Sequence, residues 1–291
     1  MFVELASILA PVFICAALGW GWVRLGRAYD RELISRLITD IGAPCLIFSR
    51  IMHAGVDPAL MLRIAGIAML AMTSFGIIGA VALRVSGLRA RTFLAPLTFG
   101  NAGNMGLPLC LFAFGEPGLA LAISYFTISA LLQFTVGIWI WTGRVSLIEL
   151  LRTPVAYAGV AAAVGVATNL EIPVWIARTT DMLGGLAIPL MLITLGVSLA
   201  EIRVGTLRRT FALSVFRLAM GFGVGVGLSW LFELGELASG VLIMQCSMPP
   251  AVFNYLFATR YGQSPEEVAS LVVGCTLLSF LLLPLLLAFV L

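Results

Sequence analysis

The chain has 291 residues, of which 61% are hydrophobic and only 11% are charged, and its formal net charge is +3. A soluble globular domain carries about 25% charged residues, and one core cannot hide this much apolar surface. The composition therefore excludes a soluble domain and predicts an all-α polytopic membrane protein in the lipid bilayer, and because the arginines are dispersed over loops we expect no nucleic-acid surface.

Ten mostly apolar runs follow one another along the chain, each about long enough for a membrane-spanning helix. They cover residues 2–23, 33–52, 60–83, 93–115, 119–142, 154–170, 182–200, 211–234, 238–258 and 268–291. The first run lacks a basic leader and ends in Trp20 and Trp22, so we interpret it as a mature helix and not as a cleaved signal peptide.

Arginines alternate between the two sides of the predicted membrane. The loops after runs one, three, five, seven and nine hold thirteen of them: Arg24, Arg27, Arg31, Arg36, Arg84, Arg89, Arg91, Arg144, Arg152, Arg203, Arg208, Arg209 and Arg260. The opposite loops hold only Arg63 and Arg178. By the positive-inside rule the first set is cytoplasmic, so we predict a plasma membrane protein, of a bacterial inner membrane, with both termini extracytoplasmic.

The two halves of the chain resemble each other. Pro44 and Pro189 are 189 − 44 = 145 residues apart, and Pro117 and Pro265, which precede runs five and ten, are 265 − 117 = 148 apart. Each half holds five runs, an odd number, so the second half must be inserted upside down. We therefore predict two inverted five-helix repeats, residues 1–142 and 154–291, joined by a short cytoplasmic connector at 143–153, an arrangement common in secondary transporters.

Runs four and nine carry helix-breaking residues in the middle of a span. Residues 99–108 hold three glycines, two asparagines and a proline, and residues 245–254 hold adjacent prolines. An offset of 147 aligns Ala102-Gly103 with Pro249-Pro250. Two half-helix N-termini, each worth about +0.5 charge, then meet near the midplane and favour a carboxylate. The substrate-binding candidates are Asn101, Gly103, Asn104, Pro108, Ser247, Pro249, Pro250 and Asn254; the alternative is two proline kinks that only shape packing.

At these residues the sequence resembles the auxin efflux carrier family. Asn101-Ala-Gly-Asn-Met-Gly-Leu-Pro108 is similar to its N-x-G-x-x-G-x-P signature, and Pro189 to Leu199 is similar to its seventh span. Met248 to Gly262, followed by Ala269-Ser270 and Thr276 to Ser279, is similar to its last two spans. The resemblance implies a bacterial carrier of the malonate or malate permease type. Its fold, like that of bile-acid symporters and sodium/proton antiporters, has crossed broken helices four and nine. Spans one, two, six and seven form the scaffold, and the other spans move.

We therefore predict a secondary transporter that moves a small organic anion by elevator-type alternating access. The alternatives are a sodium-coupled symporter of the bile-acid type, a ligand sensor that transports nothing, or a channel. Catalysis is not expected, because a Walker A loop needs a lysine that the chain lacks and His53 is the only histidine. The five cysteines lie within apolar runs without metal-ligand spacing, so no metal and no cofactor is expected.

Three further residues are possible coupling or ion sites: Asp40, Gln133 and Arg217. Asp40 pairs either with Arg36, four residues earlier, or with Arg217 across the interface between scaffold and moving unit. Gln133 either bonds a neighbouring helix or lines a sodium or substrate site. We read Arg50 as a side chain that snorkels to the membrane surface. Alternating glycines at 221–227 favour packing within one subunit, with a homodimer seam as the alternative.

Overall fold

The computed structural model describes residues 2–53, 56–143, 154–168, 170, 172–201 and 207–291. Within these residues every regular element is a helix, apart from one isolated antiparallel bridge between Gly100 and Pro250. The prediction of an all-α chain is therefore confirmed for the part that the structure describes.

The helices follow one another with short connections. The first half contains α1 (Phe2–Arg24), α2 (Arg31–Leu37), η1 (Ile38–Gly42), α3 (Ala43–His53), α4 (Pro58–Val85), α5 (Ala90–Thr98), η2 (Ala102–Gly106), α6 (Leu107–Leu132), η3 (Gln133–Gly137) and α7 (Ile138–Thr142). The second half contains α9 (Pro154–Ala167), α10 (Val174–Gly185), α11 (Ala187–Glu201), α12 (Leu207–Leu231), α13 (Glu236–Cys246), α14 (Phe253–Arg260) and α15 (Pro265–Val290).

Six helices in the described chain are long and apolar enough to cross a membrane, where the sequence predicts ten spans. They are Ala6–Arg24, Pro58–Val85, Ala102–Thr142, Val174–Ala200, Arg208–Leu231 and Pro265–Val290. Four differences separate the counts. Predicted runs four and five are counted as one stretch, although two helices meet there at Gly115, whose φ of 66° and ψ of −161° are not helical. Run two is one helical stretch of α2, η1 and α3 that carries several charged residues, and run six corresponds to α9, which has only 14 residues. Run nine is divided between α13 and α14. The chain is thus a polytopic helical membrane protein, and the count of ten stays a prediction.

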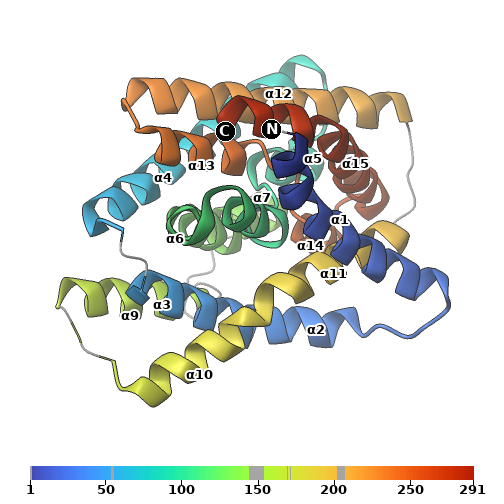
Figure 1. Cartoon of the computed structure of the whole chain (residues 1–291). Coiled ribbons are helices and arrows are strands. Elements are labelled where there is room, and N and C mark those ends of the chain that lie inside the picture. Colours follow the sequence, from blue (N-terminus) through green and yellow to red (C-terminus); the bar gives the residue numbers. More distant parts are fainter. Residues whose placement is uncertain (1, 54–55, 144–153, 169, 171, 202–206) are drawn as a thin grey trace.

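The helices pack in two groups (Figure 1). In the first group α1 packs on α11, and α3 packs on α9 and α10. In the second group α4 packs on α5 and α6, α12 packs on α13 and α15, and α14 packs on α15. Figure 1 shows α12 running across the top of the view and α3, α9 and α10 below, with α6 between them. The border between the two groups is where the candidate site lies.

Short π-helical segments shape this border. The segment η1 precedes Pro44, and η2 precedes Pro108. A proline offers no backbone N–H, so the turn before it loses a regular helical hydrogen bond and can widen. Both widened turns place their residues on the same cavity, described below.

Candidate functional site

Two non-helical segments cross in the interior, one between α5 and η2 and the other between α13 and α14. The Asn101 N–H donates to the Pro249 carbonyl at 2.6 Å, and the Ala251 N–H donates to the Phe99 carbonyl at 3.0 Å. Unwound backbone inside a membrane is tolerated where other protein groups satisfy it. The crossing supplies those partners through a short antiparallel pairing centred on Gly100 and Pro250.

The two crossing segments are related by a local two-fold symmetry. Gly100 pairs with Pro250, and the two backbone bonds exchange under a spacing of 250 − 100 = 150 residues, because Asn101 and Phe99 correspond to Ala251 and Pro249. The sequence offset of 147 aligned equivalent positions of the two halves and made no prediction about which residues pair across the crossing.

Asn254 holds the crossing together. Its side chain is fully buried, and its Nδ2 donates to the carbonyls of Phe99, at 3.1 Å, and Ala251, at 3.0 Å. These two carbonyls come from the two crossing segments, so one amide joins both. Asn254 therefore contacts the backbone of the crossing, and it does not line the cavity beside it.

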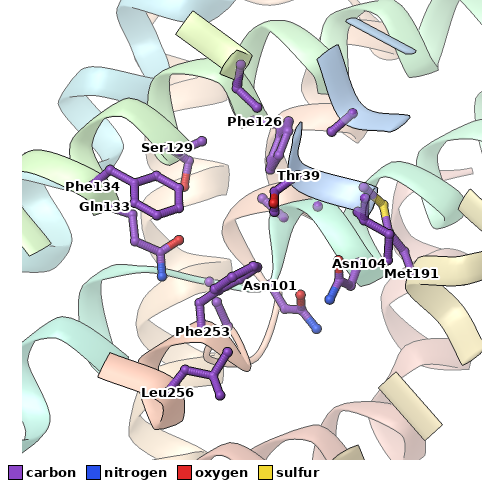
Figure 2. Close-up of a pocket in the computed structure, with 18 of the residues that line it drawn as sticks. Thr39, Asn101, Asn104, Phe126, Ser129, Gln133, Phe134, Met191, Phe253 and Leu256 are labelled. Atoms are coloured by element: carbon purple, nitrogen blue, oxygen red, sulfur yellow. The ribbon is translucent and has the colours of Figure 1, made fainter. Parts of the chain in front are cut away.

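A cavity of about 350 Å³ lies beside the crossing, between the two helix groups. The first group contributes Ile38, Thr39, Asp40, Ala43, Pro154, Val155 and Met191. The second contributes Gly100 to Asn104, Phe126, Ser129, Ala130, Gln133, Phe134, Ala251, Phe253, Leu256, Phe257 and Arg260. Figure 2 shows the amides of Asn101 and Asn104 coming from one turn, with Gln133 and Phe134 from η3. Both helix groups thus contact anything held here.

Two amides beside the cavity have a nitrogen without a hydrogen-bond partner in the described chain. Asn101 is only 3% exposed, and its Nδ2 has no hydrogen-bond partner among the described residues; the same holds for Nε2 of buried Gln133. Asn104 is partly buried and also lines the cavity. Buried amide donors are nearly always paired, so two unpaired nitrogens, each shielded from solvent by protein atoms, are unusual beside a cavity. A ligand reaches them only when the side chains turn toward it.

The backbone adds further donors at the start of η2. Within this segment the first bonded N–H groups are those of Met105 and Gly106, which both donate to the Asn101 carbonyl. The preceding N–H groups of Ala102, Gly103 and Asn104 have no backbone acceptor in the described chain, as expected for a helix N-terminus. A Cβ on Gly103 would lie 2.8 Å from the Phe126 ring. Because glycine has no side chain, the Phe126 ring can approach these donors.

The remaining substrate-binding candidates lie elsewhere. Pro108 is buried in the first turn of α6, and Pro249 and Pro250 form the crossing itself. The Ser247 hydroxyl donates to the Ile243 carbonyl at 2.7 Å and lines a separate apolar cavity between α12 and α15. The structure therefore brings Asn101, Gly103 and Asn104 together at the first cavity and leaves the other candidates outside it.

Two of the three possible coupling residues lie at the cavity and the third does not. Asp40 is exposed at the cavity and Gln133 is buried in its wall. Arg217 is fully buried in α12, and its Nη1 donates to the Cys246 carbonyl at 3.0 Å. Neither partner expected for Asp40 is engaged with it, because Arg36 forms an ion pair with Glu32 at 2.6 Å. Asp40 accepts a hydrogen bond from neighbouring Thr39 instead.

Aromatic residues of the cavity escaped the sequence analysis. Phe134 of η3 makes edge-to-face contacts with Phe253 and Phe257 of α14, at centroid separations of 6.2 and 5.8 Å. Phe253 and Phe257 are four residues apart and so share one face of α14. That spacing is visible in the sequence, but in an apolar span it does not distinguish a cavity wall from lipid-facing or core packing.

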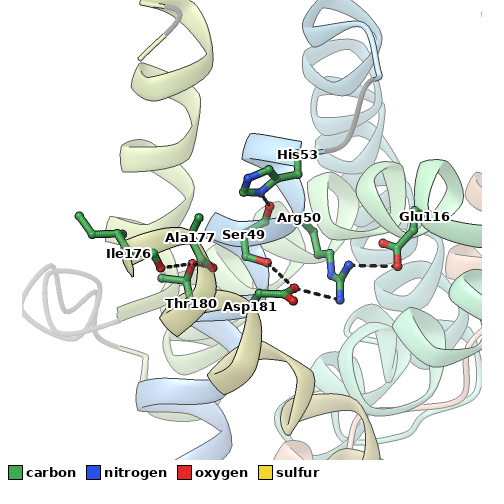
Figure 3. Close-up of polar contacts among 8 residues, drawn as sticks. All are labelled: Ser49, Arg50, His53, Glu116, Ile176, Ala177, Thr180 and Asp181. Atoms are coloured by element: carbon green, nitrogen blue, oxygen red, sulfur yellow. Dashed lines mark hydrogen bonds and ion pairs between the residues drawn. The ribbon is translucent and has the colours of Figure 1, made fainter. Parts of the chain in front are cut away.

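Farther along α3, one ion pair joins the two helix groups and a second lies within the first group (Figure 3). Arg50 of α3 contacts Glu116 of α6 at 3.0 Å and Asp181 of α10 at 3.4 Å. Ser49 also donates to Asp181, at 3.4 Å. Arg50 lies seven residues beyond Ala43 of the cavity wall, which is about 10 Å along α3. Arg50 was expected to snorkel, and the structure places its guanidinium in these ion pairs instead.

Comparison of the sequence with protein families shows which family the chain belongs to. A family model described as "Membrane transport protein" matches residues 6–149 and 141–287, which together cover nearly the whole chain. The chain belongs to the membrane transport protein family, that of the auxin efflux carriers. The predicted resemblance is thereby confirmed, and membership of the membrane transport protein family identifies a transporter and not an enzyme.

Two archaeal relatives agree with this assignment. The chain is 30% identical over 198 residues to an uncharacterized transporter of Methanocaldococcus jannaschii, and this match covers 64% of each chain. It is 28% identical over 272 residues to an uncharacterized transporter of Methanothermobacter thermautotrophicus, covering 88% of each. The first match spans slightly less than two thirds of that relative's length, and both names state a transporter without a substrate.

Proposed function

We propose that this transporter is a secondary carrier of a small organic anion and that the cavity beside the crossing is its substrate site. The observation that carries the proposal is the set of unpartnered donors there: the side-chain amides of Asn101 and Gln133 and the N–H groups at the start of η2. A carboxylate satisfies several such donors at once.

The electrostatics and size of the cavity favour a small carboxylate. The N-terminus of a helix carries about +0.5 charge, and a hydrogen bond to a charged group contributes about 1.5–3 kcal/mol. A volume of about 350 Å³ is at the small end of ligand pockets. Phe126, Phe134 and Phe253 offer an apolar wall to the carbon skeleton of the anion. Asp40 and Arg260 supply one charge of each sign at the cavity.

Alternating access is proposed from the position of the cavity. It lies between the helix groups, while Arg50 joins the same groups about two helical turns farther along α3. We assign the scaffold to predicted spans one, two, six and seven, which correspond to α1, α2 with α3, α9, and α10 with α11. The remaining helices form the moving unit, and the two repeats are residues 1–142 and 154–291. The preference of helices to pack within each group supports this division.

The orientation follows from the arginine distribution. With the arginine-rich loops in the cytoplasm, Asp40, Pro154 and Arg260 lie toward the cytoplasmic side and Arg50 toward the outside. The carrier we propose is then inward-facing in a plasma membrane, with both termini extracytoplasmic. A periplasm-active reporter fused after Leu291 is expected to be active; activity of a cytoplasm-only reporter there contradicts this orientation.

Counterflow in proteoliposomes tests the transport proposal. Purified protein is first screened for thermal stabilisation by mono- and dicarboxylates, with and without sodium, and the best ligand is radiolabelled. A carrier exchanges it in a saturable way that unlabelled substrate on the opposite side accelerates. Flux without such acceleration indicates a channel, an absence of flux indicates a sensor, and an absolute sodium requirement indicates a symporter of the bile-acid type.

A further inference from the structure

Arg217 is a charged residue that the substrate site does not directly use. It is fully buried in α12, and among the described residues no carboxylate pairs with it. Its guanidinium lies over the Phe75 ring at 4.9 Å, and its Nε and Nη2 have no hydrogen-bond partner in the described chain. An unpaired charge inside a membrane protein is costly, and such residues usually have a functional role.

The ends of two half-helices provide the compensating charge. Nη1 of Arg217 donates at 3.0 Å to the carbonyl of Cys246, the last residue of α13. Nη2 lies 2.7 Å from where a Cβ on Gly100 would stand, two residues after the end of α5 at Thr98. Each helix C-terminus carries about −0.5 charge, so two of them together match one guanidinium. Arg217 thus fills the place that a bound cation would otherwise take at the crossing.

Gly100 connects Arg217 to the cavity. Its backbone lines the cavity on one side and faces the guanidinium on the other. Only one residue's backbone therefore stands between a permanent positive charge and the space proposed for the substrate. In a buried environment of low dielectric constant the potential of such a charge extends over this distance with little screening.

We propose that Arg217 is a positioning residue that acts as the fixed internal cation of the crossing. It neutralises the C-termini of α5 and α13 and so removes their negative potential from the cavity, so that anions are preferred and no co-transported cation is needed there. This role of Arg217 adds detail to the proposed function, and the preference for anions rests on that proposed function. It also assigns the carrier to sodium-independent transport.

The potential in the cavity can be measured without knowing the substrate. Asn104→Cys is introduced into a chain whose five native cysteines are replaced by alanine, and its modification rates are compared for two thiol reagents. The probes are negatively charged sulfonatoethyl and positively charged trimethylammonioethyl methanethiosulfonate. We expect Arg217→Gln to lower the ratio of the anionic to the cationic rate about tenfold, and Arg217→Lys to preserve it.

Arg209→Gln is the matched control, because Arg209 lies on the same helix and pairs with Glu267 away from the cavity. It should leave the ratio unchanged. An unchanged ratio in folded Arg217→Gln overturns the inference. If that variant does not fold, the wild-type carrier decides: equal flux in sodium and choline media supports the inference, and a sodium requirement overturns it. If the wild type shows carboxylate counterflow but Arg217→Gln leaves the ratio of modification rates unaltered, this inference alone is refuted. If Arg217→Gln alters the ratio but the wild type shows no flux, the proposed function alone is refuted.

Discussion

The border between the two helix groups has two different ends. At one end it is hollow, with the amides of Asn101 and Gln133 left without partners beside the crossing. At the other end Arg50 reaches across to Glu116 and is held from behind by Asp181. The first end has hydrogen-bond donors without an acceptor among the described residues, and the second has charged side chains that form ion pairs with one another. This asymmetry supports the proposed carrier, which is open at the first end and closed at the second.

The two ends also differ in how firmly they are built. The crossing is held by backbone bonds and by the buried amide of Asn254. The ion pairs at the other end involve Glu116 and Asp181, whose side chains are 55% and 61% exposed. Exposed ion pairs contribute about 0–1 kcal/mol each. A contact of that size can hold one state closed and still break in each transport cycle.

Locking the ion-pair end should have the largest effect. With Arg50→Cys and Glu116→Cys in a chain without its native cysteines, a reducible bifunctional methanethiosulfonate should tie α3 to α6. Transport in proteoliposomes should fall to background and return on reduction, because the helix groups can no longer separate there. Each single cysteine variant is the control. Undiminished flux in the cross-linked protein contradicts the assignment of this end as the closed side.

Two asparagines distinguish the crossing from the cavity. Asn254→Ala removes the donor to two buried carbonyls, so thermal unfolding should reveal a loss of about 1–3 kcal/mol. Asn104→Ala touches only the cavity, so stability should change little while the half-saturation concentration for the anion rises roughly ten- to a hundredfold. The opposite pattern, in which Asn104→Ala unfolds the protein and Asn254→Ala alters only affinity, would falsify this division of roles.

Arg50→Gln should separate stability from transport. The loss of partly exposed ion pairs should cost about 1 kcal/mol or less in thermal unfolding. The closed end should nevertheless open more often, which we expect to see as faster alkylation of Glu116→Cys in intact vesicles. Arg36→Gln, which breaks the exposed pair with Glu32 within α2, is the matched control and should leave that rate unchanged. Equal alkylation rates in both variants would mean that Arg50 does not keep this end closed.

The smallest effect is expected where the loop after α1 docks on α11. The Tyr29 hydroxyl bonds to Thr194 Oγ1 at 2.7 Å. Burial raises the pKa of Tyr29 above its ordinary value of 10.0, against smaller lowering effects of Thr194 and Arg31. The folded state thus holds this proton more tightly than the unfolded state. Stability is therefore fully present below about pH 10 and is lost as the pH rises through the folded pKa.

Tyr29→Phe tests this linkage through melting temperatures measured between about pH 8 and pH 11. The variant should be less stable near pH 8 by about 0.5–1.5 kcal/mol, the contribution of one hydrogen bond. It should also lose part of the alkaline decline that the wild type shows. Parallel pH profiles for the two proteins would mean that Tyr29 does not titrate differently on folding.

Local signals in the sequence were enough to find the breaks. Prolines, glycines and asparagines in apolar runs are locally incompatible with a continuous helix, so the segments around Asn101 and Pro249 could be predicted. The same signals predicted that Asn101, Gly103 and Asn104 share a site, because they lie within one turn. Side-chain direction was not accessible in this way, and Ser247 and Asn254 accordingly face away from the cavity.

The features that the sequence did not predict depend on contacts between segments far apart in the chain. Arg50 meets partners 116 − 50 = 66 and 181 − 50 = 131 residues away, which no local pattern encodes. The pairing of Gly100 with Pro250 depends on backbone bonds between segments 150 residues apart, which the motif alignment did not predict. The break expected between runs four and five lies at Gly115, whose φ of 66° and ψ of −161° interrupt the helix there.

The most direct test of the account is the concentration dependence of counterflow in wild type and Asn101→Ala, measured side by side with the carboxylate that best stabilises the protein. Asn101 lines the cavity, and its buried amide nitrogen has no partner in the described chain, while its backbone N–H stays in the crossing. The account predicts saturable exchange in the wild type and a half-saturation concentration roughly ten- to a hundredfold higher in the variant, at an equal amount of folded protein. Identical saturation curves for the two proteins would contradict a substrate site at the crossing.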